Sequence, residues 1–195
     1  MYKRQGFDEP DVDKIDNSIS MKYGEYMIYV GRISDSKNCQ KLFDYFINYK
    51  KRNPSELKLV LVGKEDGVKI PAHRDIIHAG FVSEMEKVAL IKGAKFLVNN
   101  SINESLSLVM LESMILGRPV IVNGNCDVMR GQCQRSNAGL YYNNYQEFEA
   151  VINFMLTHSR EYEAMCKNGL DFVRKNYTWT VVIKNICDFI ETYRK

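Results

Sequence analysis

The chain has 195 residues, of which 45% are hydrophobic and 26% charged, so it is long enough to bury one sizeable core. Its net charge of +3 is too small to indicate a nucleic-acid-binding protein. No apolar run approaches the roughly 20 residues of a membrane-spanning helix, and the polar first residues lack the core of a signal peptide. We therefore expect a cytoplasmic protein.

The cysteine and histidine spacings do not match known metal or disulfide patterns. The five cysteines include no Cys-x-x-Cys pair, and the three histidines are far apart in the sequence. Zinc sites and disulfide frameworks usually show close, regular spacing of these residues. We therefore expect free thiols and no metal.

Residues 1–24 lack apolar periodicity and are rich in Asp, Asn and Ser. Such a composition is typical of a segment with little structure of its own. We expect residues 1–24 to be an interdomain linker and residues 25–195 to form one domain.

Short apolar runs alternate with helical patterns along the rest of the chain. The order predicts an α/β fold, a doubly wound Rossmann-like parallel sheet of about six strands. From residue 145 onward the apolar spacing is helical throughout. The expected strands cover residues 26–30, 57–63, 75–82, 94–99, 118–122 and 136–142.

A basic loop follows the first expected strand. It begins with Gly31 and carries Arg32 and Lys37. Because open α/β sheets bind ligands at the carboxyl ends of their strands, these two cations are candidates for phosphate binding. A solvated loop without function is the alternative, and it is common for two basic residues taken alone.

A helix expected over residues 103–116 carries an acid in an otherwise apolar surface. On a helical wheel Glu112 falls beside Ser105, about two turns away. The free N–H groups of Ser105, Leu106 and Ser107 would receive a phosphate or a polar sugar, and the Glu112 carboxylate would accept from two vicinal hydroxyls. A buried Glu112 paired with a nearby arginine is the alternative.

The motif Glu104-x7-Glu112, followed by Gly117-x-Pro119, resembles the signature of retaining glycosyltransferases of family 4. The similar part of those enzymes is the C-terminal, nucleotide-sugar-binding half of a GT-B architecture. The resemblance assigns Glu104 to the hydroxyls of the donor sugar and Glu112 to the ribose. It assigns Gly31, Arg32 and Lys37 to the diphosphate, with Arg32, Lys37 and Glu104 as the catalytic residues.

The resemblance also implies three further contacts. The base lies against the backbone of the turn that includes Val82, and the loops at Gly63 and Gly124 line the donor site. The family often has Gly-Phe-Gly where this chain has Ser105-Leu106-Ser107, so the identity of the sugar is left open.

The resemblance implies a metal-independent hexosyltransferase of polysaccharide biosynthesis. Its donor is a UDP- or GDP-type sugar, and its acceptor is a glycan or a lipid-linked glycan. The acceptor binds to an N-terminal domain that is absent here, and the full enzyme has access to the cytoplasmic membrane surface. The isolated chain is then expected to bind the donor without transferring the sugar, and to leave Tyr177, Trp179 and part of the last helix exposed.

Two other functions stay open from the residues. One is a non-catalytic interaction module that keeps the fold and docks through its C-terminal helices. The other is a different GT-B enzyme, such as a sugar-nucleotide epimerase or a phosphorylase. A substitution of Glu112 separates these possibilities, because a docking module does not depend on that carboxylate.

Overall fold

The computed structural model describes residues 6, 8–10 and 15–192. A six-stranded sheet with the order β5-β3-β1-β6-β7-β8 lies at its centre, and every neighbouring pair of strands is parallel. All six expected strands are confirmed, with somewhat different bounds. They are β1 (Tyr26–Val30), β3 (Lys58–Val62), β5 (Ile76–Gly80), β6 (Leu97–Asn99), β7 (Val120–Asn123) and β8 (Gly139–Tyr142).

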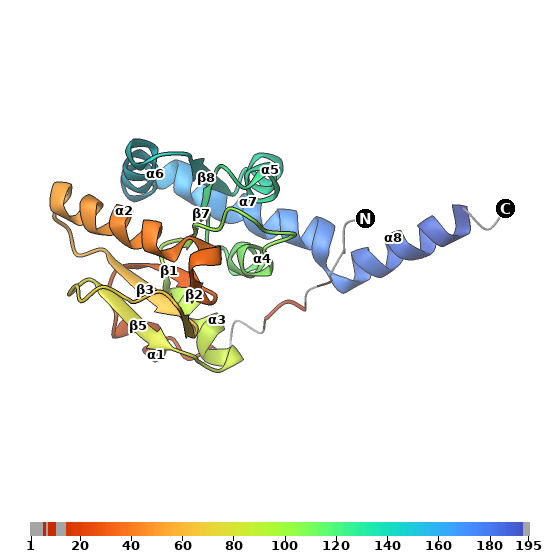
Figure 1. Ribbon diagram of the computed structural model, residues 1–195. Helices are drawn as coiled ribbons and strands as arrows, with labels where there is room; N and C mark the ends of the chain where they lie inside the picture. Colours follow the sequence, from red (N-terminus) through yellow and green to blue (C-terminus); the bar gives the residue numbers. More distant parts are fainter. Residues whose placement is uncertain (1–5, 7, 11–14, 193–195) are drawn as a thin grey trace.

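Helices cover both faces of the sheet, so the doubly wound arrangement is confirmed (Figure 1). The helices of the body are α2 (Cys39–Arg52), α3 (Glu84–Gly93), α4 (Leu108–Ile115), α5 (Asp127–Ser136), α6 (Tyr145–Thr157) and α7 (Ser159–Tyr177). The last helix, α8 (Trp179–Thr192), extends away from the body.

Alternation along the strands produces two separate cores. On β1, Ile28 packs with α3, α4 and α7, whereas Met27 and Tyr29 pack with α2 and α6 on the other face. Successive side chains of a strand point to opposite faces, so an entirely apolar strand is expected wherever both faces are covered.

The expected helix over residues 103–116 is wrong at its start. The helix α4 begins at Leu108, because Ser107 has a φ of 55° and a left-handed conformation that a helix cannot contain. Ser105 therefore lies in a loop, and Glu112 is not beside it on a shared helical face. The expected end is confirmed: Gly117 has a φ of 67°, and its N–H donates to the Met114 carbonyl at 3.0 Å.

The segment expected to be a linker contains one short helix, α1 (Ser18–Met21). Ile15 and Ile19 pack against the core on the α3 and α4 face, and Tyr23 is buried there. The described residues 15–24 thus follow the surface of the domain, and the division of the chain at residue 24 stays a prediction.

Two short strands were not expected. β2 (Ile33–Ser34) and β4 (Glu65–Asp66) form a small parallel sheet between the loops that follow β1 and β3. The pair holds these two loops together at the carboxyl edge of the main sheet. Among the described residues, no helix has the length and apolar character needed to span a membrane.

Candidate functional site

The loops after β1 and β6 meet where the strand order of the sheet reverses. β1 and β6 are neighbours, while the strands that follow them, β3 and β7, lie on opposite sides of this pair. Such a switch point opens a crevice at the carboxyl ends of the two strands, where α/β sheets bind their ligands.

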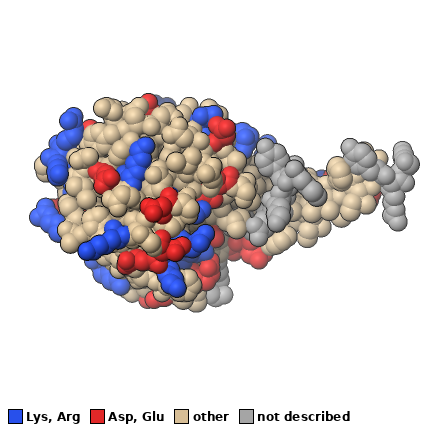
Figure 2. All heavy atoms as spheres, in the orientation of Figure 1, with Lys and Arg blue, Asp and Glu red and all other residues tan. Residues whose placement is uncertain are grey.

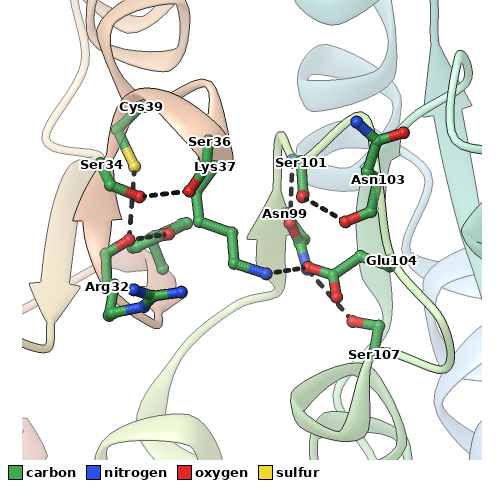
Figure 3. Close-up of polar contacts among 11 residues, drawn as sticks. Arg32, Ser34, Ser36, Lys37, Cys39, Asn99, Ser101, Asn103, Glu104 and Ser107 are labelled. Carbon is green, nitrogen blue, oxygen red and sulfur yellow. Dashed lines mark hydrogen bonds and ion pairs between the residues drawn. The ribbon is translucent and has the colours of Figure 1, made fainter.

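Lys37 and Glu104 form an ion pair across this crevice. The Lys37 Nζ lies 2.6 Å from the Glu104 Oε1, and the two side chains are 26% and 15% exposed. Figure 3 shows the lysine extending from one loop toward the carboxylate on the other. The structure therefore brings together two of the three expected catalytic side chains, although 67 residues separate them in the sequence.

Asn38 and Asn100 connect the same two loops, because the side chain of each donates to the backbone carbonyl of the other. The Asn100 side chain donates to the Asn38 carbonyl at 2.7 Å, and the Asn38 side chain donates to the Asn100 carbonyl at 3.3 Å. Asn38 has a φ of 56°, a conformation that asparagine tolerates better than most residues. The reciprocal contact fixes the position of Lys37 relative to the Glu104 loop.

Hydrogen bonds from two elements, β6 and α5, shape the loop that carries Glu104. The Asn99 side chain donates to the Ser107 Oγ at 3.1 Å and accepts from the Ser101 N–H at 3.0 Å. The Gln132 amide on α5 donates to the Leu106 carbonyl at 2.7 Å. Within the described part of the chain, the N–H groups of residues 105–107 donate to no protein group. They are available as donors to an anion beside the α4 N-terminus.

Arg32 lies at the rim of the crevice. Its side chain is 68% exposed and pairs with Asp66 at 3.4 Å. Its carbonyl accepts a hydrogen bond from the Tyr29 hydroxyl at 2.7 Å. Burial raises the pKa of Tyr29 well above its ordinary value, so this hydroxyl stays protonated and acts as a donor. The backbone at Arg32 is thus fixed, while its exposed guanidinium is held only by the 3.4 Å contact with Asp66.

Glu112 lies apart from the Lys37 pair and contacts α3. Its Oε1 lies 3.1 Å from the Lys87 Nζ, which also pairs with Glu84 at 2.7 Å. The alternative expectation was that Glu112 pairs with a nearby arginine. In the structure Glu112 is paired, but its partner is a lysine. Glu112 remains 25% exposed, so the ion pair does not seal it from solvent.

Two expected glycines lie where backbones approach closely. Gly31 and Gly63 have φ values of 151° and 139°, and a Cβ built on Gly63 would lie 2.0 Å from the Gly31 carbonyl oxygen. A side chain at Gly63 would therefore push apart the loops after β1 and β3.

The other two expected positions lie at the ends of β5 and β7. Gly124 donates its N–H to the Tyr142 carbonyl at 2.8 Å. Val82 lies between β5 and α3 and packs against the core that includes α4. A hollow of about 470 Å³ lies beside the Glu104 loop, with Ser105, Asn125 and Asp127 in its wall. The binding roles of these residues stay predictions.

The sequence reasoning missed the buried polar residues that hold the site together. Asn100 is fully buried, and its Oδ1 accepts from the Tyr142 hydroxyl at 2.7 Å and from the Asn123 side chain at 3.3 Å. Asparagines stand at the ends of two apolar strands, and a buried amide needs a hydrogen-bond partner. Their positions could therefore have predicted a contact between the two strand ends. The sequence contained no comparable signal for Lys87, because its partner Glu112 lies on a different helix. In the described ranges, no three His, Cys, Asp or Glu side chains gather as a metal site would require.

The sequence is similar to those of known proteins. Residues 12–172 match the sequence model of a family described as glycosyl transferases group 1. The chain is 24% identical over 164 residues to the alpha-monoglucosyldiacylglycerol synthase of Streptococcus pneumoniae, and covers 37% of it. It is 27% identical over 101 residues to the glycosyltransferase 1 domain-containing protein 1 of Xenopus tropicalis, and covers 28% of it. The chain thus spans about a third of the length of these curated relatives, with 80% and 50% of its own residues matched.

Solved structures share the fold. The crystal structure of HepE from Anabaena in complex with UDP and glucose superposes with a TM-score of 0.77 at 14% identity. That match covers 95% of this chain and 55% of HepE. The C-terminal domain of LpcC from Francisella tularensis, a glycosyl transferase group 1 family protein, gives a TM-score of 0.67 at 18% identity. That match covers 84% of this chain and 93% of the LpcC domain.

Proposed function

The chain belongs to the glycosyl transferases group 1 family, and on this premise we propose that it is the donor-binding half of a retaining glycosyltransferase. Its fold is that of the Rossmann-like C-terminal domains of GT-B glycosyltransferases. The proposed donor is a nucleoside diphosphate-sugar of the UDP or GDP type, and the proposed acceptor is a glycan or a lipid-linked glycan. The acceptor and any general base belong to the other half of the GT-B architecture.

The observation that carries this proposal is the Lys37–Glu104 pair at the switch point of the sheet. A cation and a carboxylate lie side by side there, next to the N–H groups of residues 105–107, which donate to no described residue. These three features match the two parts of a donor's reacting end. The cation and the N–H groups suit a diphosphate, and the carboxylate suits sugar hydroxyls.

In this proposal the bond between the sugar C1 and the diphosphate oxygen breaks, and an acceptor hydroxyl bonds to C1 on the same face and gives its proton to the departing diphosphate. Negative charge develops on the departing diphosphate. Lys37, Arg32 and the loop N–H groups stabilise that charge, which is where fixed donors and cations lower a barrier most. Glu104 orients the sugar and Glu112 accepts from the ribose. The cations perform the charge neutralisation that other transferases assign to a metal.

Calorimetric titration of the purified chain with UDP, GDP and ADP tests the proposal. We expect one uridine or guanosine nucleotide to bind, and Lys37→Ala and Glu112→Ala each to weaken its binding by about 1–3 kcal/mol, as for the loss of a charged hydrogen bond. Lys95→Met is the matched control. Lys95 lies just before β6, at the edge of the sheet opposite the candidate site, and its ammonium pairs with Glu25. The substitution therefore removes a surface cation far from the site.

Absence of binding to all three nucleotides would contradict the proposal, as would binding that both substitutions leave unchanged. An interaction module predicts the second of these results. The isolated chain is expected to transfer no sugar from UDP-glucose. Turnover at about 1 s⁻¹ or faster, within the usual range of enzymes, would show that the acceptor site lies in this chain.

A further inference from the structure

Lys87 connects α3 to the expected ribose-binding acid. Its ammonium lies 3.1 Å from the Glu112 Oε1, and its side chain is only 18% exposed. Glu112 is the fifth residue of α4, so the contact joins two helices that cover the same face of the sheet. A pair that is partly withdrawn from water is screened less by salt than a surface pair and is held more firmly.

The contact leaves part of the Glu112 carboxylate free. Within the described part of the chain, only the Oε1 atom has a protein donor, and the Oε2 atom has none. An ionised carboxylate offers about four acceptor positions on its two oxygens. One engaged oxygen therefore fixes the rotation of the group, and the remaining positions can accept from two hydroxyls at once.

We propose that Lys87 is a positioning residue of the nucleoside subsite, where it orients Glu112 so that the carboxylate accepts from the ribose hydroxyls. This inference rests on the proposed function, which places the ribose at Glu112. Lys87 itself touches the carboxylate and not the donor, so it acts on specificity through Glu112.

The surroundings keep Lys87 charged. Burial by itself would lower the pKa of Lys87, but the hydrogen bond to Glu84 and the charge of Glu112 outweigh it and raise the pKa above its ordinary value. Glu84 is 75% exposed, so its share of the contact is weakened by solvent. Glu112 is only 25% exposed, so its contact with Lys87 is screened less by solvent than the Glu84 contact.

The test compares UDP with 2′-deoxy-UDP, which lacks one of the two hydroxyls. The unmodified chain is expected to prefer UDP by about tenfold, the worth of one charged hydrogen bond. Lys87→Met is expected to lose about tenfold in UDP affinity and little in 2′-deoxy-UDP affinity, so that the preference disappears. Lys87→Arg keeps the cation and is expected to keep the preference.

Two controls separate positioning from simple charge. Lys95→Met removes one positive charge at the far edge of the sheet and is expected to leave the preference unchanged. Glu84→Gln removes the other partner of Lys87 while the Glu112 contact remains, and is expected to preserve the preference as well. Thermal unfolding verifies each variant, and Lys87→Gln replaces Lys87→Met if the methionine variant is unfolded.

Each outcome of the titrations has a distinct meaning. Equal losses for UDP and 2′-deoxy-UDP in Lys87→Met would overturn the positioning role in favour of a general charge effect. Unchanged affinities would overturn it outright. If the unmodified chain bound neither UDP nor GDP, the proposed function would fail, and this inference would fail with it.

Discussion

Through its backbone and side chain, Asn100 joins the ends of three strands to the loop after β1. It contacts Asn38 after β1, Asn123 at the end of β7 and Tyr142 at the end of β8, while it directly follows β6 itself. A buried polar cluster is stable only when its members satisfy one another, because an unpaired buried group costs about 1–3 kcal/mol. The geometry of the Lys37–Glu104 pair therefore depends on residues that touch neither side chain.

Tyr142→Phe tests this cluster. The substitution removes the hydroxyl that donates to Asn100 at 2.7 Å, and we expect the free energy of unfolding to fall by about 1–2 kcal/mol. Tyr141→Phe is the matched control, because the adjacent tyrosine is 37% exposed and its hydroxyl bonds to no described residue; we expect a change within about 0.5 kcal/mol. Urea denaturation measures both. Equal effects would show that the buried hydroxyl contributes nothing specific.

The cysteines differ in reactivity because they differ in burial. Burial raises the pKa of the Cys133 thiol to about 12, so almost none of it is thiolate at pH 8. Cys187 on α8 is exposed. We expect iodoacetamide at pH 8 to label Cys187 first and to leave Cys133 unlabelled until the protein unfolds, as peptide mass spectrometry can show. Early labelling of Cys133 in the folded protein would contradict its burial.

At the scale of elements, the loops after β1 and β3 approach each other through two glycines. A Cβ at Gly63 would lie 2.0 Å from the backbone oxygen of Gly31, whereas a Cβ at Gly67 would meet nothing within 4 Å. Both residues have positive φ values, so alanine is strained at either position. Only at Gly63 does the strain come with a clash that must move a neighbouring loop.

Gly63→Ala is therefore expected to destabilise the protein more than Gly67→Ala. We expect a loss of more than about 2 kcal/mol at Gly63, from the backbone strain and the clash together, and about 1 kcal/mol at Gly67 from strain alone. Thermal unfolding of the two variants measures the difference. UDP binding should weaken only in Gly63→Ala, because the new Cβ would displace Gly31 and with it the next residue, Arg32. Similar unfolding temperatures for the two variants would argue against the close approach of the loops.

At the scale of the whole molecule, α8 is the element that the body does not enclose. Val182 is buried, but Trp179, Ile183 and Ile186 are 44%, 54% and 48% exposed. Tyr177, which was expected to be exposed as well, instead packs partly against the core. On the face shown in Figure 2, acidic and basic side chains are interspersed over the body, whereas the projecting helix is mostly uncharged. An apolar helix face of this kind favours association in water.

We expect the chain to self-associate through this apolar face, and Ile183→Lys combined with Ile186→Lys to reduce that association without changing stability. The two side chains contribute little to the folded core, so the free energy of unfolding should change by no more than about 0.5 kcal/mol. Sedimentation velocity and thermal unfolding measure the two quantities. Val182→Lys is the control, and we expect it to cost several kcal/mol because it buries an unpaired charge. A large loss of stability in the double variant would mean that α8 packs on the body in solution.

The fold class and the six strands could be predicted from the residues of the chain alone. Continuous apolar strands flanked by helical patterns permit few architectures, since both faces of such strands must be covered. The sequence also placed Lys37 and Glu104 at one edge of the sheet, because the ends of parallel strands gather there. These predictions depend on periodicity and strand order, which are properties of the chain alone.

The start of α4 and the partners of Glu104 and Glu112 depend on tertiary packing. The left-handed Ser107 makes α4 begin later than the sequence pattern predicts, because the Asn99 side chain and the Gln132 amide hold the preceding loop from outside. Glu112 takes Lys87 from a helix that lies 25 residues earlier, and local pattern contains no information about such a contact. Hydrogen bonds between distant segments are selected by packing, so they follow from the fold and not from spacing along the chain.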